Sequence, residues 1–264
     1  MNPLLEIILS SDKPLEDQVS MIKAQGLSEQ PWVEIYLHKF LTVDPTCLAL
    51  KDKVRQLATV REPVIIYGET GTGKQLIAQA LHGRFLTDKS LVEKPFVHLN
   101  CAGLPDSLFE SELFGHAKGA FTGAITNKIG LIFHAKHGTL FLDEVAEMPL
   151  VSQAKLLTAI QEGVARPIGD NESSPVNCRF ICATHHKLED DVKAGKFRED
   201  LYWRLSTHEL TIPAINCRVE TEVSFLTCNL CPDFPMELVE KIPLSGNVRS
   251  IQRSIARWKL YGHL

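Results

Sequence analysis

The sequence predicts an α/β fold in which a parallel β-sheet is combined with helices. One observation is that short apolar segments such as "VIIY", "GTLFLDEV" and "CRFICAT" are each followed by a segment with helical spacing. A second is that a glycine-rich loop stands between the first of these strands and its helix. Strands that alternate with helices in this way are normally joined by crossovers and lie parallel in one sheet.

The composition is that of an ordinary globular protein. The chain has 264 residues, of which 44% are hydrophobic and 23% are charged, so one large domain and a smaller part are expected. A net charge of −4 argues against a protein that binds nucleic acid through bulk charge. The apolar segment "LLEIIL" at residues 4–9 is too short for a membrane span and has no basic leader. We therefore expect no membrane partner and a cytoplasmic location.

Three parts are expected along the chain. Residues 1–41 predict two or three short helices, with Pro31 in the first turn of one of them. Residues 42–213 contain the alternating strands and helices, and residues 214–264 close with the basic helical segment "GNVRSIQRSIARWKLYGHL". The first part carries no ligand signature and is expected to be a small helical appendage.

The loop "GETGTGK" fits the phosphate-binding pattern G-x-x-x-x-G-K. Its glycines let backbone N–H groups approach phosphate oxygens, the helix that follows directs its positive end at the anion, and the lysine reaches the β- and γ-phosphates. The next residue is usually a Ser or Thr that binds Mg²⁺, and here it is glutamine. A strand before the loop and a helix after it favour this interpretation over a simple turn. The expected nucleotide contacts are Gly68, Glu69, Thr70, Gly71, Thr72, Gly73, Lys74 and Gln75.

An acidic pair, Asp143 and Glu144, ends the apolar strand "GTLFLDEV". In a phosphate-loop enzyme the first acid holds Mg²⁺, directly or through water, and the second orients and activates the attacking water. Paired acids at a strand end are common in loops, but here they follow a phosphate loop. The sequence thus predicts hydrolysis of a nucleotide as well as its binding.

Seven cysteines are irregularly spaced, and only Cys228 and Cys231 form a C-x-x-C pair. With Cys217 and His208 upstream, a zinc site is one interpretation and a disulfide another. Reduced thiols that pack in the interior are the favoured interpretation, because no firm set of four ligands is apparent.

Four segments together resemble a known family: "GETGTGK", "NCAGLPDSLFESELFGHAKGAFTGA", "GTLFLDEVAEMP" and "FREDLYWRL". They are similar to the central AAA+ domain of bacterial enhancer-binding proteins, the ATPases that activate transcription by sigma-54 RNA polymerase. The resemblance covers about residues 42–213 and resumes at "GNVR". It implies a P-loop AAA+ three-layer sandwich with a parallel sheet, a reduced helical lid and a short helical N-terminal appendage.

The resemblance assigns a partner-binding role to the segment "GAFTGA". In the family this segment tips a surface loop that contacts sigma-54 and moves with the state of the nucleotide. Phe121 and Thr122 would make the contact, while the glycines would supply hinge freedom. The segment comprises Gly119, Ala120, Phe121, Thr122, Gly123 and Ala124.

Further catalytic roles follow from the resemblance alone. Asn100 is similar to the switch residue that keeps the catalytic glutamate, Glu144 here, away from water. Thr184 resembles the first sensor of the γ-phosphate, although the family usually continues with Asn where this chain has His185.

Three arginines carry roles from the same resemblance. Arg198 and Arg204 match a pair of arginine fingers that act across a subunit boundary. The implied working form is a homo-oligomeric ring, hexameric or heptameric. Arg249 resembles the second sensor in the lid, but Leu244-Ser245 stand where the family has Trp-Pro.

The lid region departs most from the family. The chain reads "PAINCR" where the family has Pro-Pro-Leu-Arg-x-Arg, and the segment from Pro213 to Gly246 is shorter than expected. Too few residues follow Arg249 for a helix-turn-helix domain, so no sequence-specific DNA binding by this chain alone is expected.

The expected function is a Mg²⁺-dependent ATPase that uses ATP to remodel the sigma-54 RNA polymerase holoenzyme in its closed complex. The short lid and His185 leave an alternative open, a regulatory subunit with weak ATPase activity that binds sigma-54 or co-assembles with a full-length homologue. A third interpretation is an AAA+ remodeller of another client.

Overall fold

The computed structural model describes residues 15–26, 31–82 and 94–263. The chain forms two compact units, each built from separate stretches of sequence. The P-loop unit comprises Met1–Thr59, Gly68–Leu91 and Thr211–Leu264, and the sheet unit comprises Val60–Tyr67 and Val92–Leu210. The division into three parts that the sequence suggests, residues 1–41, 42–213 and 214–264, stays a prediction.

The sheet unit is built on a five-stranded sheet in the order β2-β5-β8-β1-β9. Parallel pairing joins β2 to β5, β5 to β8 and β8 to β1. Because consecutive parallel strands need crossovers, the predicted alternation of strands and helices is confirmed. The strands are β1 (Val64–Tyr67), β2 (Phe96–Asn100), β5 (Thr139–Asp143), β8 (Arg179–Thr184) and β9 (His208–Thr211).

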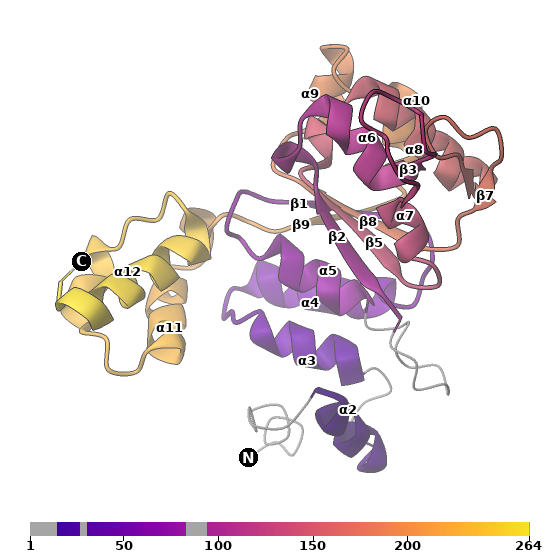
Figure 1. Cartoon of the computed structure of the whole chain (residues 1–264). Helices are drawn as coiled ribbons and strands as arrows, with labels where there is room; N and C mark the ends of the chain where they lie inside the picture. The colour runs from indigo at the N-terminus through magenta and orange to yellow at the C-terminus, as the bar shows by residue number, and fades with distance from the viewer. Residues whose placement is uncertain (1–14, 27–30, 83–93, 264) are drawn as a thin grey trace. The chain divides into compact units, whose positions relative to one another are not determined.

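Helices of the sheet unit pack on one face of this sheet (Figure 1). Alternate strand residues, such as Leu140 and Leu142 of β5 and Phe180 and Cys182 of β8, belong to the core that contacts them. Every residue of β8 is buried, as expected for a central strand of a parallel sheet. The helices are α6 (Asp106–Phe114), α7 (Leu131–His134), α8 (Leu150–Glu162), α9 (Leu188–Lys193) and α10 (Glu199–Leu205), with short 3₁₀ turns η2 (Cys101–Gly103) and η3 (Val145–Glu147).

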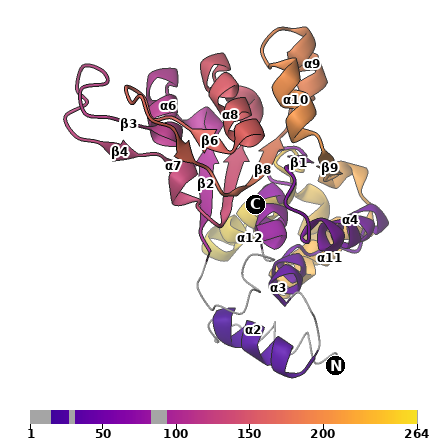
Figure 2. The ribbon, with the colours of Figure 1, turned by 90° about the vertical axis from the view of Figure 1, so that its right-hand side faces the viewer.

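Two short antiparallel ribbons complete the sheet unit. Strands β3 (Gly115–His116) and β4 (Lys128–Ile129) pair at the base of a loop that contains residues 119–124, and the loop extends from the unit in Figure 2. Strands β6 (Val164–Ala165) and β7 (Ser174–Pro175) form the other ribbon.

The P-loop unit is helical in its described residues. Within the expected appendage, α2 (Leu15–Ala24) and α3 (Pro31–Lys39) are present, while residues 1–14 and 27–30 lie outside the described residues. Helix α4 (Pro45–Leu57) begins at a local signal: Asp44 accepts a hydrogen bond from the backbone N–H of Cys47 at 3.0 Å, and proline occupies the first turn. Helix α5 (Lys74–His82) follows the glycine-rich loop, where the sequence predicts a helix.

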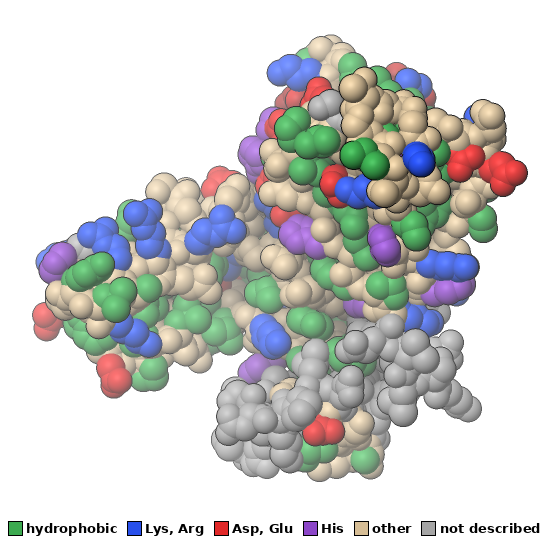
Figure 3. Space-filling view, in the orientation of Figure 1, with side chains coloured by type: hydrophobic (Ala, Val, Ile, Leu, Met, Phe, Trp, Pro, Cys, Tyr) green, Lys and Arg blue, Asp and Glu red, His purple; other side chains and the backbone are tan. Residues whose placement is uncertain are grey.

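The lid region, residues 214–264, has a small apolar core of its own. Helix α11 (Thr221–Leu230) and helix α12 (Asn247–Tyr261) contribute Leu226, Ile251 and Ile255 to it. Short 3₁₀ segments, η4 (Ile215–Cys217) and η5 (Met236–Lys241), complete the region. Lys and Arg side chains are visible over α12 in Figure 3, and Arg253, Arg257 and Lys259 are exposed, as the basic sequence predicts. Among the helices that the structure describes, none has the length and apolar character needed to cross a bilayer.

Candidate nucleotide-hydrolysis and partner-binding sites

The phosphate-loop residues adopt a conformation that suits an anion. Gly71 and Gly73 have φ values of +83° and +106°, a region that glycine enters without steric cost. The hydroxyl of Thr72 donates to the carbonyl oxygen of Glu69 at 2.8 Å, which fixes the turn from within. Helix α5 begins at Lys74, so its N-terminus lies at the end of the loop. The loop thus fits a bound phosphate group.

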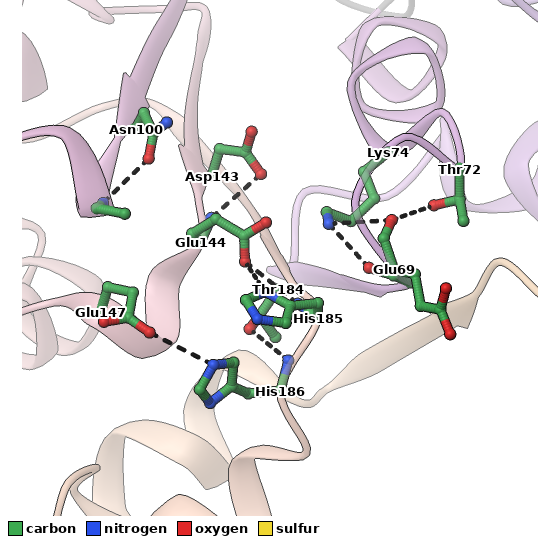
Figure 4. A network of polar contacts seen from close by, with 12 residues as sticks. Glu69, Thr72, Lys74, Asn100, Asp143, Glu144, Glu147, Thr184, His185 and His186 are labelled. Atoms are coloured by element: carbon green, nitrogen blue, oxygen red, sulfur yellow. Dashed lines mark hydrogen bonds and ion pairs between the residues drawn. The ribbon is translucent and has the colours of Figure 1, made fainter. Parts of the chain in front are cut away.

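Lys74 is turned back onto the loop, since its Nζ donates to the carbonyl oxygen of Gly68 at 2.8 Å and lies 3.5 Å from that of Glu69 (Figure 4). The lysine is 7% exposed, whereas Gln75 is exposed. The ammonium group therefore sits in the mouth of the loop, where an anion would meet it.

The start of α12 packs directly on the phosphate loop. Asn247 is 1% exposed and has a φ of +54°; its amide nitrogen donates to Oε2 of Glu69 at 3.0 Å and to the carbonyl oxygen of Thr70 at 3.1 Å. Its amide oxygen accepts from the backbone N–H of Ile215 at 2.7 Å. A Cβ atom added at Gly71 would stand 2.3 Å from a lid carbonyl oxygen and 3.1 Å from Cβ of Arg249. The glycine is thus required by the lid as well as by the expected ligand, and the arginine assigned as second sensor begins beside the loop.

A buried ion pair in the same unit lies behind the loop. Arg218 and Glu222 are joined at 2.9 Å, and both side chains are fully buried. The two carboxylate oxygens of Glu222 also accept from the hydroxyl of Thr42 and from the backbone N–H groups of Val43 and Asp44. The Glu222 carboxylate therefore fastens the segment before α4 to the lid, and Asp44 adds a second link by accepting from the backbone N–H of Val219 at 3.0 Å.

In the sheet unit, the expected catalytic residues gather at the carboxyl ends of neighbouring strands. Asn100 ends β2 and is the register partner of Asp143, which ends β5. Thr184 ends β8, which pairs with β5 so that Cys182 is the register partner of Leu142. Because carboxyl ends of parallel strands share one edge, this edge carries the amide, the acids and the hydroxyl together (Figure 4).

Glu144 has a left-handed backbone conformation, with φ 52° and ψ 51°. For a residue with a Cβ atom this conformation costs about 1–2 kcal/mol, and such residues concentrate at functional sites. Its backbone N–H donates to Oδ1 of Asp143 at 3.1 Å. The strained backbone at Glu144 therefore directs its carboxylate away from the direction taken by the Asp143 carboxylate.

Glu144 and Asn100 make contacts that differ from those implied by the family resemblance, in which Asn100 restrains the glutamate. Oε2 of Glu144 lies 2.6 Å from Nδ1 of His185 and accepts from the backbone N–H of the same residue at 3.3 Å. The side-chain oxygen of Asn100 accepts from the backbone N–H of Ala102 at 3.0 Å and so caps η2. The sequence marked His185 only as a departure from the family; its contact with the glutamate was not predicted.

Thr184 is fully buried, and its hydroxyl oxygen accepts from the backbone N–H of His186 at 3.0 Å. The His186 ring lies between two carboxylates, with Nδ1 at 3.1 Å from Asp191 and Nε2 at 3.4 Å from Glu147. Burial raises the pKa of the nearby Cys182 thiol to about 12, so this cysteine is a packing residue at neutral pH.

Of the two arginines matched to fingers, Arg198 immediately precedes α10 and Arg204 lies in its last turn, and both are exposed. Arg198 is anchored at its backbone, where its N–H donates to Oε1 of the buried Gln153 at 2.8 Å. Its guanidinium forms a two-pronged contact with Asp200, at 3.0 Å and 2.8 Å, and this hydrogen-bonded carboxylate raises the pKa of the guanidinium. A surface arginine placed on a fixed backbone suits action on a second molecule.

The GAFTGA loop is closed by its own backbone. The N–H of Gly119 donates to the carbonyl oxygen of Ala124 at 2.9 Å, and Gly119 and Gly123 have φ values of +83° and +99°. Phe121 is 41% exposed and meets the ring of His116 edge-on at 5.0 Å. The loop therefore presents Phe121 and Thr122 on a compact turn.

The cysteines are not uniformly packing residues. Cys231 lies in the lid core, whereas Cys217 and Cys228 are exposed. The seven thiols, all within the described residues, form no disulfide with one another. In the described part of the chain, no group of three or more His, Cys, Asp and Glu side chains is placed to hold a metal ion.

The chain is similar in sequence to known transcription regulators. It is 46% identical to the response regulator protein PilR of Pseudomonas aeruginosa over 183 residues, which are 69% of this chain and 40% of PilR. It is 39% identical to the anaerobic nitric oxide reductase transcription regulator NorR of Salmonella paratyphi C over 257 residues, which are 92% of this chain and 49% of NorR. The chain thus spans half or less of the length of these relatives.

The fold has solved counterparts. The structure of NtrX from Brucella abortus in complex with ADP matches with a TM-score of 0.75 at 24% identity, over 96% of this chain and 58% of the other. At this identity the match establishes the fold, and it confirms the predicted α/β architecture with a parallel sheet. The family model described as the sigma-54 interaction domain matches residues 40–211, well over half of the chain. The chain belongs to the sigma-54 interaction domain family.

Proposed function

We propose that the chain is a Mg²⁺-dependent ATPase that works in the cytoplasm as a homo-oligomeric ring and remodels the sigma-54 RNA polymerase holoenzyme. One observation carries the proposal: a phosphate loop, a strand-end acidic pair and an intact GAFTGA loop occur together within the region that the family model matches. A structure of the relative NtrX in complex with ATP supports a nucleotide as ligand.

Within the P-loop unit, the backbone N–H groups of residues 68–74 and the ammonium of Lys74 would hold the phosphates. Arg249, which begins beside Gly71, would complete the contacts from the lid. A magnesium ion, when bound, would neutralise phosphate charge during hydrolysis. Gln75 stands at the usual hydroxyl position, so ion binding would rely more on Asp143.

Within the sheet unit, Glu144 would take a proton from the attacking water, and Asn100 and Thr184 would tune its orientation and that of the γ-phosphate. Arg198 and Arg204 would act on the nucleotide of a neighbouring subunit, where they stabilise charge in the transition state. A single subunit is then expected to be nearly inactive, because its own fingers serve another site.

The GAFTGA loop would transmit the result of hydrolysis to sigma-54 through Phe121 and Thr122. The exposed ring of Phe121 supports this role, because a half-exposed aromatic on a compact turn supplies apolar contact area at small entropic cost.

The test is ATP hydrolysis measured against protein concentration, with and without sigma-54, for the native chain and for Glu144→Ala. Specific activity should rise as subunits associate and be lost in Glu144→Ala. Phe121→Ala should keep hydrolysis and lose sigma-54 binding, while Val151→Ala, which removes part of a 64% exposed side chain on α8, should change neither. Flat, negligible hydrolysis with sigma-54 still bound would contradict the ATPase and support a regulatory subunit.

A further inference from the structure

The carboxylate of Glu144 is bound by residue 185 through two donors. Oε2 of Glu144 faces Nδ1 of the His185 ring at 2.6 Å and the backbone N–H at 3.3 Å (Figure 4). Glu144 follows the last residue of β5, and His185 follows the last residue of β8. Since these strands are neighbours in the sheet, the backbone brings the two residues together.

The His185 ring is itself held in place. It meets the ring of His186 edge-on, with centroids 4.3 Å apart, and that second ring is bound by Asp191 and Glu147 on either side. The Glu144 side chain is 15% exposed and that of His185 is 44% exposed, so the pair lies at the rim of the site. A constrained imidazole at the rim can hold the carboxylate and still separate from it.

A short contact of this kind opposes general-base chemistry. Two N–H donors on one carboxylate oxygen favour the charged form, which makes the carboxylate a weaker base, and they hold it toward residue 185. Meanwhile the side-chain oxygen of Asn100, which the resemblance assigns to this restraint, caps its own turn at Ala102.

We propose that His185 is a positioning residue that clamps Glu144 in the resting state, so that Glu144 accepts a proton from water only after the Nδ1 contact has opened. This inference rests on the proposed ATPase function. The amide nitrogen of an asparagine side chain occupies nearly the same place relative to its backbone as Nδ1 of a histidine. A clamp that acts through that atom should therefore survive His185→Asn and be lost in His185→Ala.

Hydrolysis at saturating ATP provides the first test. A hydrogen bond to a charged group contributes about 1.5–3 kcal/mol, and about 1.4 kcal/mol corresponds to tenfold in rate. His185→Ala is expected to raise kcat by at least about tenfold with KM unchanged, while His185→Asn stays within about twofold of the native chain. His134→Ala is the control, because it removes an exposed imidazole at the end of α7, and its kcat should not rise.

Nitrogen-15 NMR of histidine-labelled protein without nucleotide provides a readout that does not depend on activity. His185 should carry its proton on Nδ1, and Glu144→Gln should shift that resonance. An Nδ1 without a proton, an unchanged resonance in Glu144→Gln, or an unchanged or lower kcat in His185→Ala would overturn the clamp. If the native chain hydrolyses ATP in these cases, the proposed function stands without it. If the native chain is inactive and His185→Ala is active, the clamp is supported in its strongest form.

Discussion

Glu222 is expected to be the most stability-sensitive acidic residue of the P-loop unit. Its carboxylate is fully buried and accepts from Arg218 at 2.9 Å, from Thr42 at 2.8 Å and from two backbone N–H groups at 2.8 Å and 3.2 Å. Glu222→Ala removes all four acceptor contacts and leaves the Arg218 guanidinium buried without its counter-charge.

Removing one partner of a buried ion pair costs about 3–5 kcal/mol, most of it the penalty for the charge left behind. For a chain of this size each kcal/mol lowers the melting temperature by about 2–4 °C, so a decrease of roughly 6–20 °C is expected. Because the penalty lies in the unpaired charge, the double variant Arg218→Met with Glu222→Leu should recover most of the loss.

Thermal melts of the native chain, Glu222→Ala, the double variant and Glu220→Ala measure the effect, with the exposed Glu220 as control. Hydrogen exchange locates it: amides of α4 and α11 should lose protection while those of β5 and β8 keep it. A decrease below about 2 °C for Glu222→Ala, or a double variant no more stable than the single one, would refute the reasoning.

Three further predictions concern other parts of the chain. Burial alone would raise the pKa of Asp44, but hydrogen bonds from the backbone N–H groups of Cys47, Val219 and Thr46 outweigh it and lower that pKa below 3.8. Its stabilising contribution is therefore complete above pH 3.8 and lost as pH falls through the lower folded value; Asp44→Ala should cost about 1–2 kcal/mol near pH 7 and flatten the acid limb of a denaturation series. Cys217 and Cys228 should react with a thiol reagent at pH 8, whereas Cys178, whose pKa burial raises to about 12, should react only after unfolding, as mass spectrometry of modified peptides would show. Gly71→Ala should lower stability by about 1–3 kcal/mol in a denaturant titration, because the new Cβ would stand 2.3 Å from the carbonyl oxygen of Gly246, while Gly26→Ala, with nothing within 4 Å of its Cβ, serves as a control for the positive φ alone.

The elements that the sequence predicted well are those whose signals are local. "VIIY" became β1 and "CRFICAT" became β8, because each is a short apolar run followed by a segment with helical spacing, which is the pattern of a parallel α/β sheet. The start of helix α4 carries a local signal of the same kind, since Asp44 caps it and Pro45 follows. The strand order and the discontinuous units were beyond such signals, since both depend on which segments meet far along the chain.

The contacts that hold the phosphate loop show this limit. Asn247 bonds to Glu69 across 178 positions, and Glu222 bonds to Thr42 across 180. In the sequence Asn247 is one letter of "GNVR", and Glu222 is the single charged residue of the lid helix α11. A short lid buries little apolar surface area. These polar contacts nevertheless attach the lid specifically to the phosphate loop and to the segment before α4, and buried area does not measure that attachment.

The departure at His185 shows why a motif must be read through its geometry. From the sequence alone, a histidine where the family has an asparagine suggests that the polar contacts of the first sensor are lost. The alternative of a weak ATPase rests in part on this departure. In the structure, Nδ1 of His185 lies 2.6 Å from Oε2 of Glu144 and donates to it. This nitrogen occupies nearly the same place that the amide nitrogen of an asparagine side chain would occupy. The substitution then preserves the donor and changes what surrounds it, adding a ring that meets the ring of His186 edge-on. The same residue can thus be interpreted as a lost contact with Glu144 or as a contact that is kept and strengthened. Only the position of the donor atom distinguishes these opposite conclusions.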